Sequence, residues 1–161
     1  MSFKIVNLSS KCEIQFLETD DLKNEEIKLV VKQLDSGDPA KNWVPAYHFY
    51  IYDLFGSVLG TCDLRIGCTD DLYYSGHIGY SIKEEYRGHH YAAKACSLLF
   101  SLAKKHGMHD LYVTCNPDNV PSRKTCEYLN GEFLGIVELP ESNDMRKNKG
   151  ETHKCIYKFI L

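Results

Sequence analysis

The chain has 161 residues, 43% of them hydrophobic and 25% charged, a composition typical of one folded domain. Its 19 Lys and Arg residues against 22 Asp and Glu residues give a formal net charge of -3, so it carries no broad basic surface for a polyanion. We therefore expect one domain over residues 1–161 that binds no nucleic acid.

Seven cysteines are scattered through the sequence, without a CxxC pair and without histidines at zinc spacing. This pattern is typical of reduced thiols that fill a core, and it predicts no metal site. The N-terminal residues lack the pattern of a signal peptide, and no apolar run approaches the roughly 20 residues that span a bilayer. We therefore expect a cytoplasmic protein that binds no membrane.

The first third of the chain predicts a strand followed by a helix. Cys12–Leu17 has the composition of a first strand. Apolar residues from Ile27 to Leu34 follow the i, i+3, i+4, i+7 spacing of a helix with one apolar face.

Three strands come next. Residues 46–53 are aromatic and β-branched, a turn follows at 54–57, and apolar residues then alternate up to residue 66, which predicts an antiparallel hairpin. A third strand is expected at 76–82, after a polar break at 67–72.

The second half predicts two helices and three strands. The longest helix runs from Tyr91 to His106 and stops at Gly107, and a strand follows at 110–115. Asn119 is a good N-cap for a short helix that ends at Leu129. The last strands are expected at 133–139 and 154–161, and the polar stretches 35–41 and 141–153 are expected as surface loops. This order predicts an α/β or α+β domain on one mixed sheet.

The loop from Tyr86 to Ala93 joins a strand to the longest helix. Backbone N–H groups at a helix start point in one direction, and the helix dipole adds roughly half a positive charge there. Arg87 can add a charged fork, and Gly88 lets a phosphate approach the backbone. The segment is therefore either an anion-binding loop or a plain turn with a surface arginine.

Residues 76–93 (GHIGYSIKEEYRGHHYAA) resemble the cofactor motif of the GNAT superfamily of acetyl-CoA-dependent N-acetyltransferases, whose signature is Q/R-x-x-G-x-G/A. The six positions are filled by Arg87, Gly88, His89, His90, Tyr91 and Ala92. Asn119-Val120-Pro121-Ser122 and the segment 129–133 resemble the Asn-x-x-Ser/Ala helix of the family and the strand after it. The chain most resembles the branch related to ribosomal-protein N-terminal acetyltransferases.

The resemblance implies a GNAT-like domain with a mixed, mostly antiparallel sheet of about six or seven strands, flanked by helices and splayed in the middle. Acetyl-CoA would be the co-substrate, with its pyrophosphate on residues 87–93 and its pantetheine between the strands at 76–82 and 110–115. The thioester would lie beside Tyr80. The implied cofactor-binding residues are Tyr80, Ser81, Ile82, Arg87, Gly88, His89, His90, Tyr91, Ala92, Ala93, Asn119 and Ser122.

His90 departs from the signature, which has glycine at this position. If the position needs a positive φ, a histidine costs about 1–2 kcal/mol relative to glycine. The imidazole would either approach a phosphate or point into solvent.

Catalysis needs a base, because an alkyl amine with a pKa near ~10.4 is almost entirely ammonium at neutral pH. His77 stands where the related branch often has a glutamate, and it is either this base or a buried, hydrogen-bonded strand histidine. The departing thiolate needs an acid, and the family often has a tyrosine where this chain has Cys126. Cys126 is either that acid or a packed thiol, Tyr128 is a further candidate two residues on, and a solvent proton is the alternative.

The implied reaction is direct transfer of an acetyl group to a primary amine in a ternary complex, the acceptor being a small-molecule amine or a peptide N-terminus. The acceptor pocket is expected among the early helix, the loop at 35–43 and the loop at 141–153, with Trp43, Tyr47 and Phe49 as walls or as plain core. Alternatives are a catalytically silent acyl-CoA sensor of the same fold and a site for another phosphorylated ligand. The final strand could pair with its copy in a homodimer.

Overall fold

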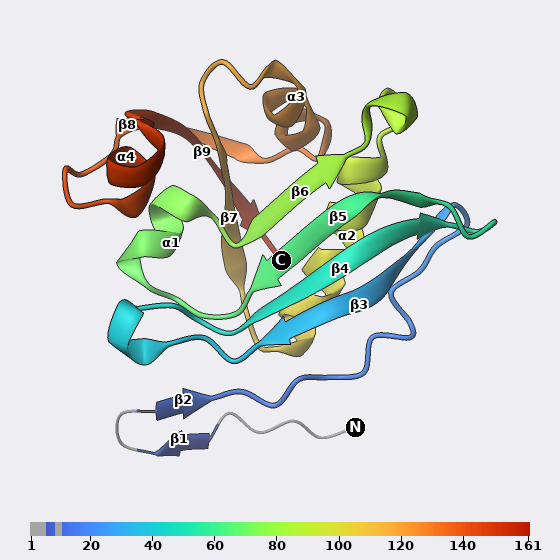
Figure 1. Ribbon diagram of the computed structural model, residues 1–161, viewed down its shortest axis with the longest axis horizontal. Helices are drawn as coiled ribbons and strands as arrows, with labels where there is room; N and C mark the ends of the chain where they lie inside the picture. The colour runs from blue at the N-terminus through green and yellow to red at the C-terminus, as the bar shows by residue number, and fades with distance from the viewer. Residues whose placement is uncertain (1–5, 9–10) are drawn as a thin grey trace.

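The computed structural model describes residues 6–8 and 11–161, and Figure 1 shows its elements. The strands are β1 (Val6–Leu8), β2 (Lys11–Glu13), β3 (Ile27–Asp35), β4 (Ala46–Asp53), β5 (Val58–Arg65), β6 (Ile78–Ile82), β7 (Asp110–Cys115), β8 (Glu132–Glu138) and β9 (His153–Ile160). The α-helices are α1 (Asp70–Ser75), α2 (Tyr91–Lys105), α3 (Val120–Tyr128) and α4 (Asp144–Lys149), and short 3-10 helices are η1 (Pro39–Lys41) and η2 (Glu84–Tyr86).

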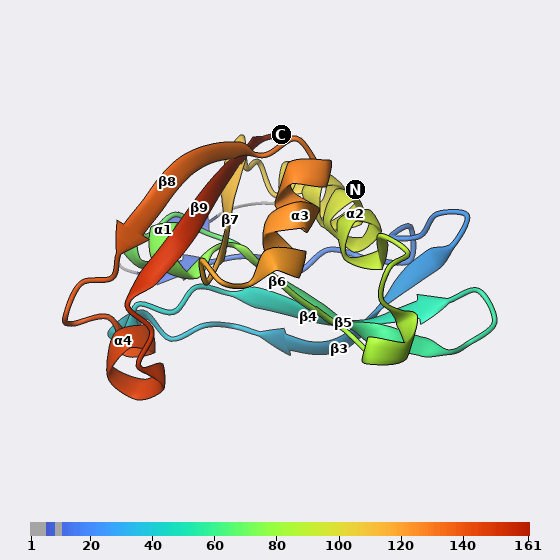
Figure 2. The ribbon, with the colours of Figure 1, turned by 90° about the horizontal axis from the view of Figure 1, so that it is seen from above.

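Seven strands form two antiparallel sheets that diverge from one another. One sheet has the order β3-β4-β5-β6 and the other the order β7-β9-β8, while β1 and β2 form a separate small hairpin. Figure 2 shows α2 and α3 together on one face of the four-stranded sheet. The mixed α/β architecture with a sheet that is split in the middle is therefore confirmed.

The core lies between α2 and the two sheets. Helix α2 buries Ala95, Leu99 and Leu102 on one face, against strand residues such as Phe49 and Leu64. Burial of a leucine or phenylalanine side chain stabilises a fold by about 1.5–3 kcal/mol. Five cysteines are buried free thiols, as the sequence predicted: Cys62, Cys96, Cys115, Cys126 and Cys155. Cys68 is exposed, and the side chain of Cys12 lies outside the described residues.

The helix expected from Ile27 to Leu34 is wrong, because these residues form strand β3. Ile27 and Leu29 are 0% and 4% exposed, whereas Val30, Val31 and Leu34 are 38–45% exposed. The alternation at the start of the segment is therefore that of a strand with one buried face. A bulge between Val31 and Gln33 shifts the register against β4, so Val31 and Leu34, which are opposite Phe49 and Tyr47, share a face at a spacing of three residues as in a helix.

Several boundaries also differ from the expectation. The first strand is described only at Lys11–Glu13, and residues 14–19 have no regular structure. The polar break at 67–72 contains the start of α1, and the loop at 141–153 contains α4. Residues 110–115 form β7 as predicted, and α2 and α3 each end one residue from the predicted boundary.

The final strand is not an exposed edge. Strand β9 pairs with β7 on one side and with β8 on the other. The expectation that this strand pairs with a second copy is therefore wrong, since both of its edges are already used. Among the described residues, none of the helices combines the length and the apolar character needed to cross a membrane.

Candidate functional site

Strands β6 and β7 come together just before β6 begins. The backbone N–H of His77 donates to the carbonyl oxygen of Tyr112 at 2.7 Å. Beyond this point the two strands belong to different sheets and diverge toward their C-terminal ends, as Figure 1 shows. The divergence leaves one edge of β6 without a neighbouring strand.

The register of the β5–β6 pair decides which backbone groups lie on that edge. Lys83 donates its N–H to Leu59, and His77 accepts at its carbonyl from Arg65, so odd-numbered residues of this segment bond to β5. In an antiparallel pair the intervening residues direct their N–H and C=O groups away from the partner. The backbone groups of Tyr80 and Ile82 therefore face the gap, whereas those of Ser81 face β5.

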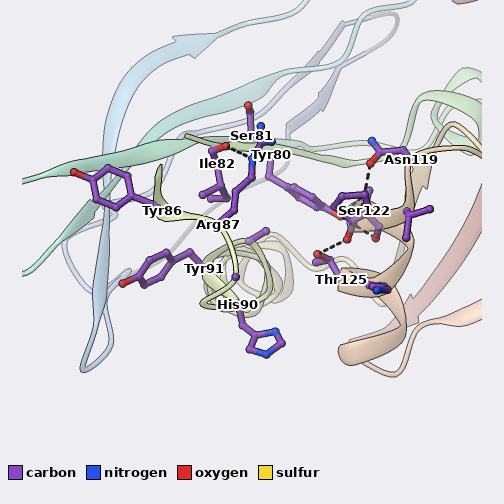
Figure 3. Close-up of a pocket in the computed structure, with 15 residues that line it drawn as sticks. Tyr80, Ser81, Ile82, Tyr86, Arg87, His90, Tyr91, Asn119, Ser122 and Thr125 are labelled. Atoms are coloured by element: carbon purple, nitrogen blue, oxygen red, sulfur yellow. Dashed lines mark hydrogen bonds between the residues drawn. The ribbon is translucent and has the colours of Figure 1, made fainter. Parts of the chain in front are cut away.

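A cavity of about 580 Å³ lies at the divergence, between β6, the start of α2 and the start of α3 (Figure 3). Ten of the twelve cofactor-binding residues implied by the sequence line it: Tyr80, Ser81, Ile82, Arg87, Gly88, His90, Tyr91, Ala92, Asn119 and Ser122. The other two lie outside the lining, because Ala93 is buried in the core and His89 is exposed with its ring against Tyr91.

Five further lining residues were not among the implied cofactor-binding residues, although three of them lie in the segments that carry the resemblance: Tyr86, Val120, Pro121, Lys124 and Thr125. Four of them come from α3, where Pro121, Lys124 and Thr125 have the i, i+3, i+4 spacing of one helix face. Since Pro121 follows the predicted N-cap Asn119 by two residues, this spacing could have identified Lys124 and Thr125.

The start of α2 presents unpaired backbone donors to the cavity. The helix has no side-chain cap, and its first turn has no intrahelical acceptor for its N–H groups. Gly88 and His90 have positive φ angles of 89° and 59°, which turn the chain sharply into the helix. Together with the helix dipole, this geometry suits an anion.

The imidazole of His90 packs on a tyrosine. Its ring stacks on Tyr128 with the centroids 4.0 Å apart and an interplanar angle of 11°. Figure 3 shows the ring pointing away from Arg87 and Tyr80. Of the two orientations considered from the sequence, the one into solvent describes the ring better, since His90 is exposed and its ring rests on the exposed Tyr128.

Arg87 lies between β6 and α2, where its Nε donates to the carbonyl oxygen of Ile82 at 3.0 Å (Figure 3). This bond orients the side chain at the cavity wall. The remaining guanidinium N–H groups stay available for a charged ligand.

Tyr80 connects β6 to α3 across the inner end of the cavity. Its hydroxyl lies 2.7 Å from Oγ of Ser122, and Asn119 caps α3 by accepting from the N–H of Ser122 at 3.3 Å. Burial raises the pKa of Tyr80 well above its ordinary value, so the phenol keeps its proton at neutral pH.

Cys126 and Tyr128, the two candidate acids, are both outside the cavity lining. Cys126 is buried beneath Tyr80, and burial raises the pKa of its thiol to about 12. Tyr128 is 57% exposed at the end of α3, where it contacts His90. The cavity therefore does not bring either side chain to the free edge of β6.

His77, the candidate base, is buried with both ring nitrogens occupied. Its Nδ1 accepts from the N–H of Tyr112 at 2.9 Å, and its Nε2 lies 3.0 Å from the carbonyl oxygen of Gly67, to which it donates. Burial lowers its pKa, which favours the neutral ring. This geometry is that of a strand-bridging histidine without a free lone pair.

The expected pocket walls are only partly accessible. Tyr47 and Phe49 are fully buried, so of the two alternatives given by the sequence the structure has them as plain core. The hydroxyl of Tyr47 accepts from the N–H of Leu17 and contacts Nε2 of His106. Trp43 is exposed and lies under the ammonium of Lys41.

Several solved structures share this fold. A microcin C7 self-immunity acetyltransferase, MccE, solved with acetyl-CoA and AMP, has a TM-score of 0.57 and 19% identity over 72% of this chain and 61% of its own. The ribosomal-protein-S5-alanine acetyltransferase of Vibrio fischeri has a TM-score of 0.55 and 21% identity over 71% and 61% of the two chains.

A third structure is an acetyltransferase from Salmonella typhimurium that modifies the N-terminal serine of a 50S ribosomal subunit protein. It has a TM-score of 0.55 and 18% identity over 72% of this chain and 64% of its own. The chain therefore spans less than two thirds of the length of these structures.

No curated protein matches the sequence significantly. A family model described as an acetyltransferase (GNAT) domain matches residues 18–131, which is more than half of the chain. With the site geometry and the shared fold, this match shows that the chain belongs to the GNAT acetyltransferase domain family.

Proposed function

We propose that the protein is an acetyl-CoA-dependent N-acetyltransferase that moves the acetyl group to a primary amine by direct attack. The observation that carries the proposal is the uncapped start of α2, which faces a cavity bordered by the free edge of β6. A nucleotide pyrophosphate fits the first feature, and an amide-bearing arm fits the second.

The residues at the cavity match the parts of this co-substrate. The backbone of residues 88–92 and the guanidinium of Arg87 would hold the pyrophosphate. The backbone groups of Tyr80 and the N–H of Ile82 would pair with the pantetheine amides, since the Ile82 carbonyl oxygen already accepts from Arg87. When bound there, acetyl-CoA supplies an activated acetyl group beside Tyr80.

Among the side chains near the cavity, Tyr80 and Ser122 are the best candidates for the general acid that protonates the thiolate. Their hydroxyls are bonded to each other at the cavity wall, and burial keeps the Tyr80 proton in place at neutral pH. This pair can donate a proton to a departing thiolate more directly than Cys126, which is buried below it. We therefore assign proton donation to the Tyr80–Ser122 pair, with resupply from solvent.

For the acceptor, two similar structures are ribosomal-protein acetyltransferases, one named for an alanine of protein S5 and the other described as modifying the N-terminal serine of a 50S subunit protein. This likeness supports a peptide N-terminus or a small amine as acceptor. Both carry a primary ammonium, which must lose a proton before it attacks the thioester.

A catalytically silent acyl-CoA-binding protein is the second candidate. The observation that favours it concerns the two side chains expected to act as base and acid. His77 has both ring nitrogens in hydrogen bonds, and Cys126 is buried. Such a protein would bind acetyl-CoA and would not release its thiol.

Two measurements on the full chain test these candidates. Calorimetric titration with acetyl-CoA, compared with ADP and with adenosine 3′,5′-diphosphate, should give binding that requires the pantetheine arm. Thiol release should then be measured with putrescine, phenethylamine and the tripeptide Ser-Ala-Ala. Amine-dependent release supports the transferase, binding alone supports the silent protein, and absence of binding overturns both.

A further inference from the structure

A row of four residues crosses the face of the four-stranded sheet that lies opposite α2 and α3. In the strand registers Gln33 is opposite His48, His48 is opposite Asp63, and Asp63 is opposite Gly79. The neighbouring row, Phe49–Cys62–Tyr80, points toward the core. Since side chains alternate along a strand, Asp63 stands on the outer face. Figure 2 shows that this face is turned away from both helices.

The carboxylate of Asp63 lies over the backbone of Gly79. A Cβ added to Gly79 would come within 2.9 Å of Oδ2 of Asp63. Gly79 belongs to β6, between Ile78 and Tyr80, whose backbone groups face the gap toward β7. The missing side chain of Gly79 therefore lets the carboxylate approach the β6 backbone one residue from Tyr80, beside which the thioester is proposed to lie.

The second oxygen of Asp63 is held in place from the other side. Its Oδ1 is 3.3 Å from Nη1 of Arg65, and the same nitrogen donates to the carbonyl oxygen of Gly76 at 3.2 Å. Oδ1 is buried and makes no hydrogen bond within the described residues, while the Asp63 side chain as a whole is 24% exposed. Arg65 therefore holds Oδ1 by charge, and the carboxylate keeps hydrogen-bonding capacity for the N–H donors of a ligand.

We propose that Asp63 is the acceptor-amine site, where its carboxylate binds a primary ammonium and takes a proton from it. The inference rests on the proposed acetyl transfer, for which His77 offers no free lone pair. The charged and titratable neighbours on this face are Arg65 and His48. Arg65 pairs with Oδ1 and leaves Oδ2 over the backbone of Gly79.

The chemistry balances with this single base. The ammonium gives one proton to Asp63, and the resulting amine attacks the thioester carbonyl carbon, which forms the C–N bond. The C–S bond then breaks and its electron pair leaves on sulfur. The second amine proton neutralises the thiolate by way of the Tyr80–Ser122 pair, and Asp63 releases its proton to solvent.

The same face has room for the rest of an acceptor. A hollow of about 520 Å³ is lined by residues that include Tyr50, Thr61 and Ser81. Thr61 and Ser81 are opposite each other, one outward-facing position along from Asp63 and Gly79. An acceptor with its ammonium at Asp63 could therefore extend over the sheet toward β4.

The test is Asp63→Asn in the full chain, with Glu132→Gln on β8 as the control for loss of a remote carboxylate. Thiol release with putrescine, phenethylamine and Ser-Ala-Ala should fall about 100-fold in kcat/KM for Asp63→Asn, because an acid–base group contributes roughly 10²–10⁴-fold. Calorimetric Kd for acetyl-CoA should stay unchanged in both variants, and Asp63→Glu should recover part of the activity.

A second variant covers a failure of Asp63→Asn to fold. Gly79→Ala places a methyl group against Oδ2 of Asp63 and should raise KM for the amine several-fold while acetyl-CoA still binds. Full activity in Asp63→Asn, or in Gly79→Ala if only that variant folds, would overturn the inference and leave acetyl transfer standing. A wild-type protein that binds no acetyl-CoA, or binds it without thiol release, would overturn the inference through the transferase function itself.

Discussion

His77 joins the two sheets by a two-point contact with Tyr112. Its backbone N–H donates to the Tyr112 carbonyl oxygen at 2.7 Å, and its imidazole Nδ1 accepts from the Tyr112 N–H at 2.9 Å. The ring thus takes the place of a main-chain acceptor that a regular ladder would supply. Because β6 and β7 separate beyond this contact, His77 determines where the gap between the sheets begins.

We expect His77→Ala to lower the free energy of unfolding by roughly 2–4 kcal/mol, because it leaves the Tyr112 N–H and the Gly67 carbonyl oxygen unpaired in the interior. Urea denaturation at pH 7 measures the change. His89→Ala, an exposed histidine outside the cavity lining, is the matched control and should stay within about 0.5 kcal/mol of wild type. Unchanged stability together with loss of an ionisation from the pH profile of turnover would instead identify His77 as the base.

Acid should destabilise the protein through two buried histidines. Burial lowers the pKa of His77, and it lowers that of His106 from 6.5 to about 4. Below pH 6.5 these histidines are protonated in the unfolded chain and still neutral in the folded chain. The free energy of unfolding therefore falls as the pH drops from about 6.5 toward 4.

For His106 alone the full loss over this window is roughly 3 kcal/mol. Urea denaturation between pH 7 and pH 5 measures the slope above the range in which carboxylates titrate. The variant His106→Gln should have a shallower slope. A stability curve that is flat between pH 7 and pH 5 would contradict the burial of both rings.

Arg87→Ala should weaken acetyl-CoA binding about tenfold or more, because a hydrogen bond to a charged group contributes roughly 1.5–3 kcal/mol. The side chain is already oriented at the cavity by its bond to Ile82. Calorimetry measures Kd, and Lys32→Ala on β3 is the control for loss of one positive charge. Equal affinities in the two variants would place the pyrophosphate elsewhere.

His90→Gly should leave the affinity for acetyl-CoA within about twofold of wild type, because the imidazole stacks on Tyr128 and points away from Arg87. Relief of the positive φ is worth about 1–2 kcal/mol and offsets the lost stacking, so the melting temperature should change little. A large loss of affinity would show that the imidazole does reach the phosphate.

Tyr80→Phe should reduce kcat by about tenfold or more while the Kd for acetyl-CoA stays close to that of wild type. The change removes the hydroxyl that bonds to Ser122 and keeps the ring in place. Single-turnover thiol release measures the chemical step. Unchanged release would assign protonation of the thiolate to solvent.

The sequence by itself determined the local features that carry the cofactor site. The start of α2, the strand at 110–115 and the cap of α3 by Asn119 depend on short-range signals, namely helix periodicity, a strand-length apolar run and capping chemistry. For this reason, ten of the twelve predicted cofactor-binding residues line one cavity.

Tertiary structure alone decided the rest. A bulge in β3 places Val31 and Leu34 on one face at a helix-like spacing of three residues, and only the pairing with β4 shows that the segment is a strand. The hydrogen bonds that occupy both ring nitrogens of His77 are made with Gly67 and Tyr112, which are 10 and 35 residues away in the sequence. The position of Asp63 over Gly79 follows from a strand register that no local pattern encodes. The sequence gives the chemical type of each side chain. Long-range packing determines which of these side chains lie next to each other across the gap between the sheets.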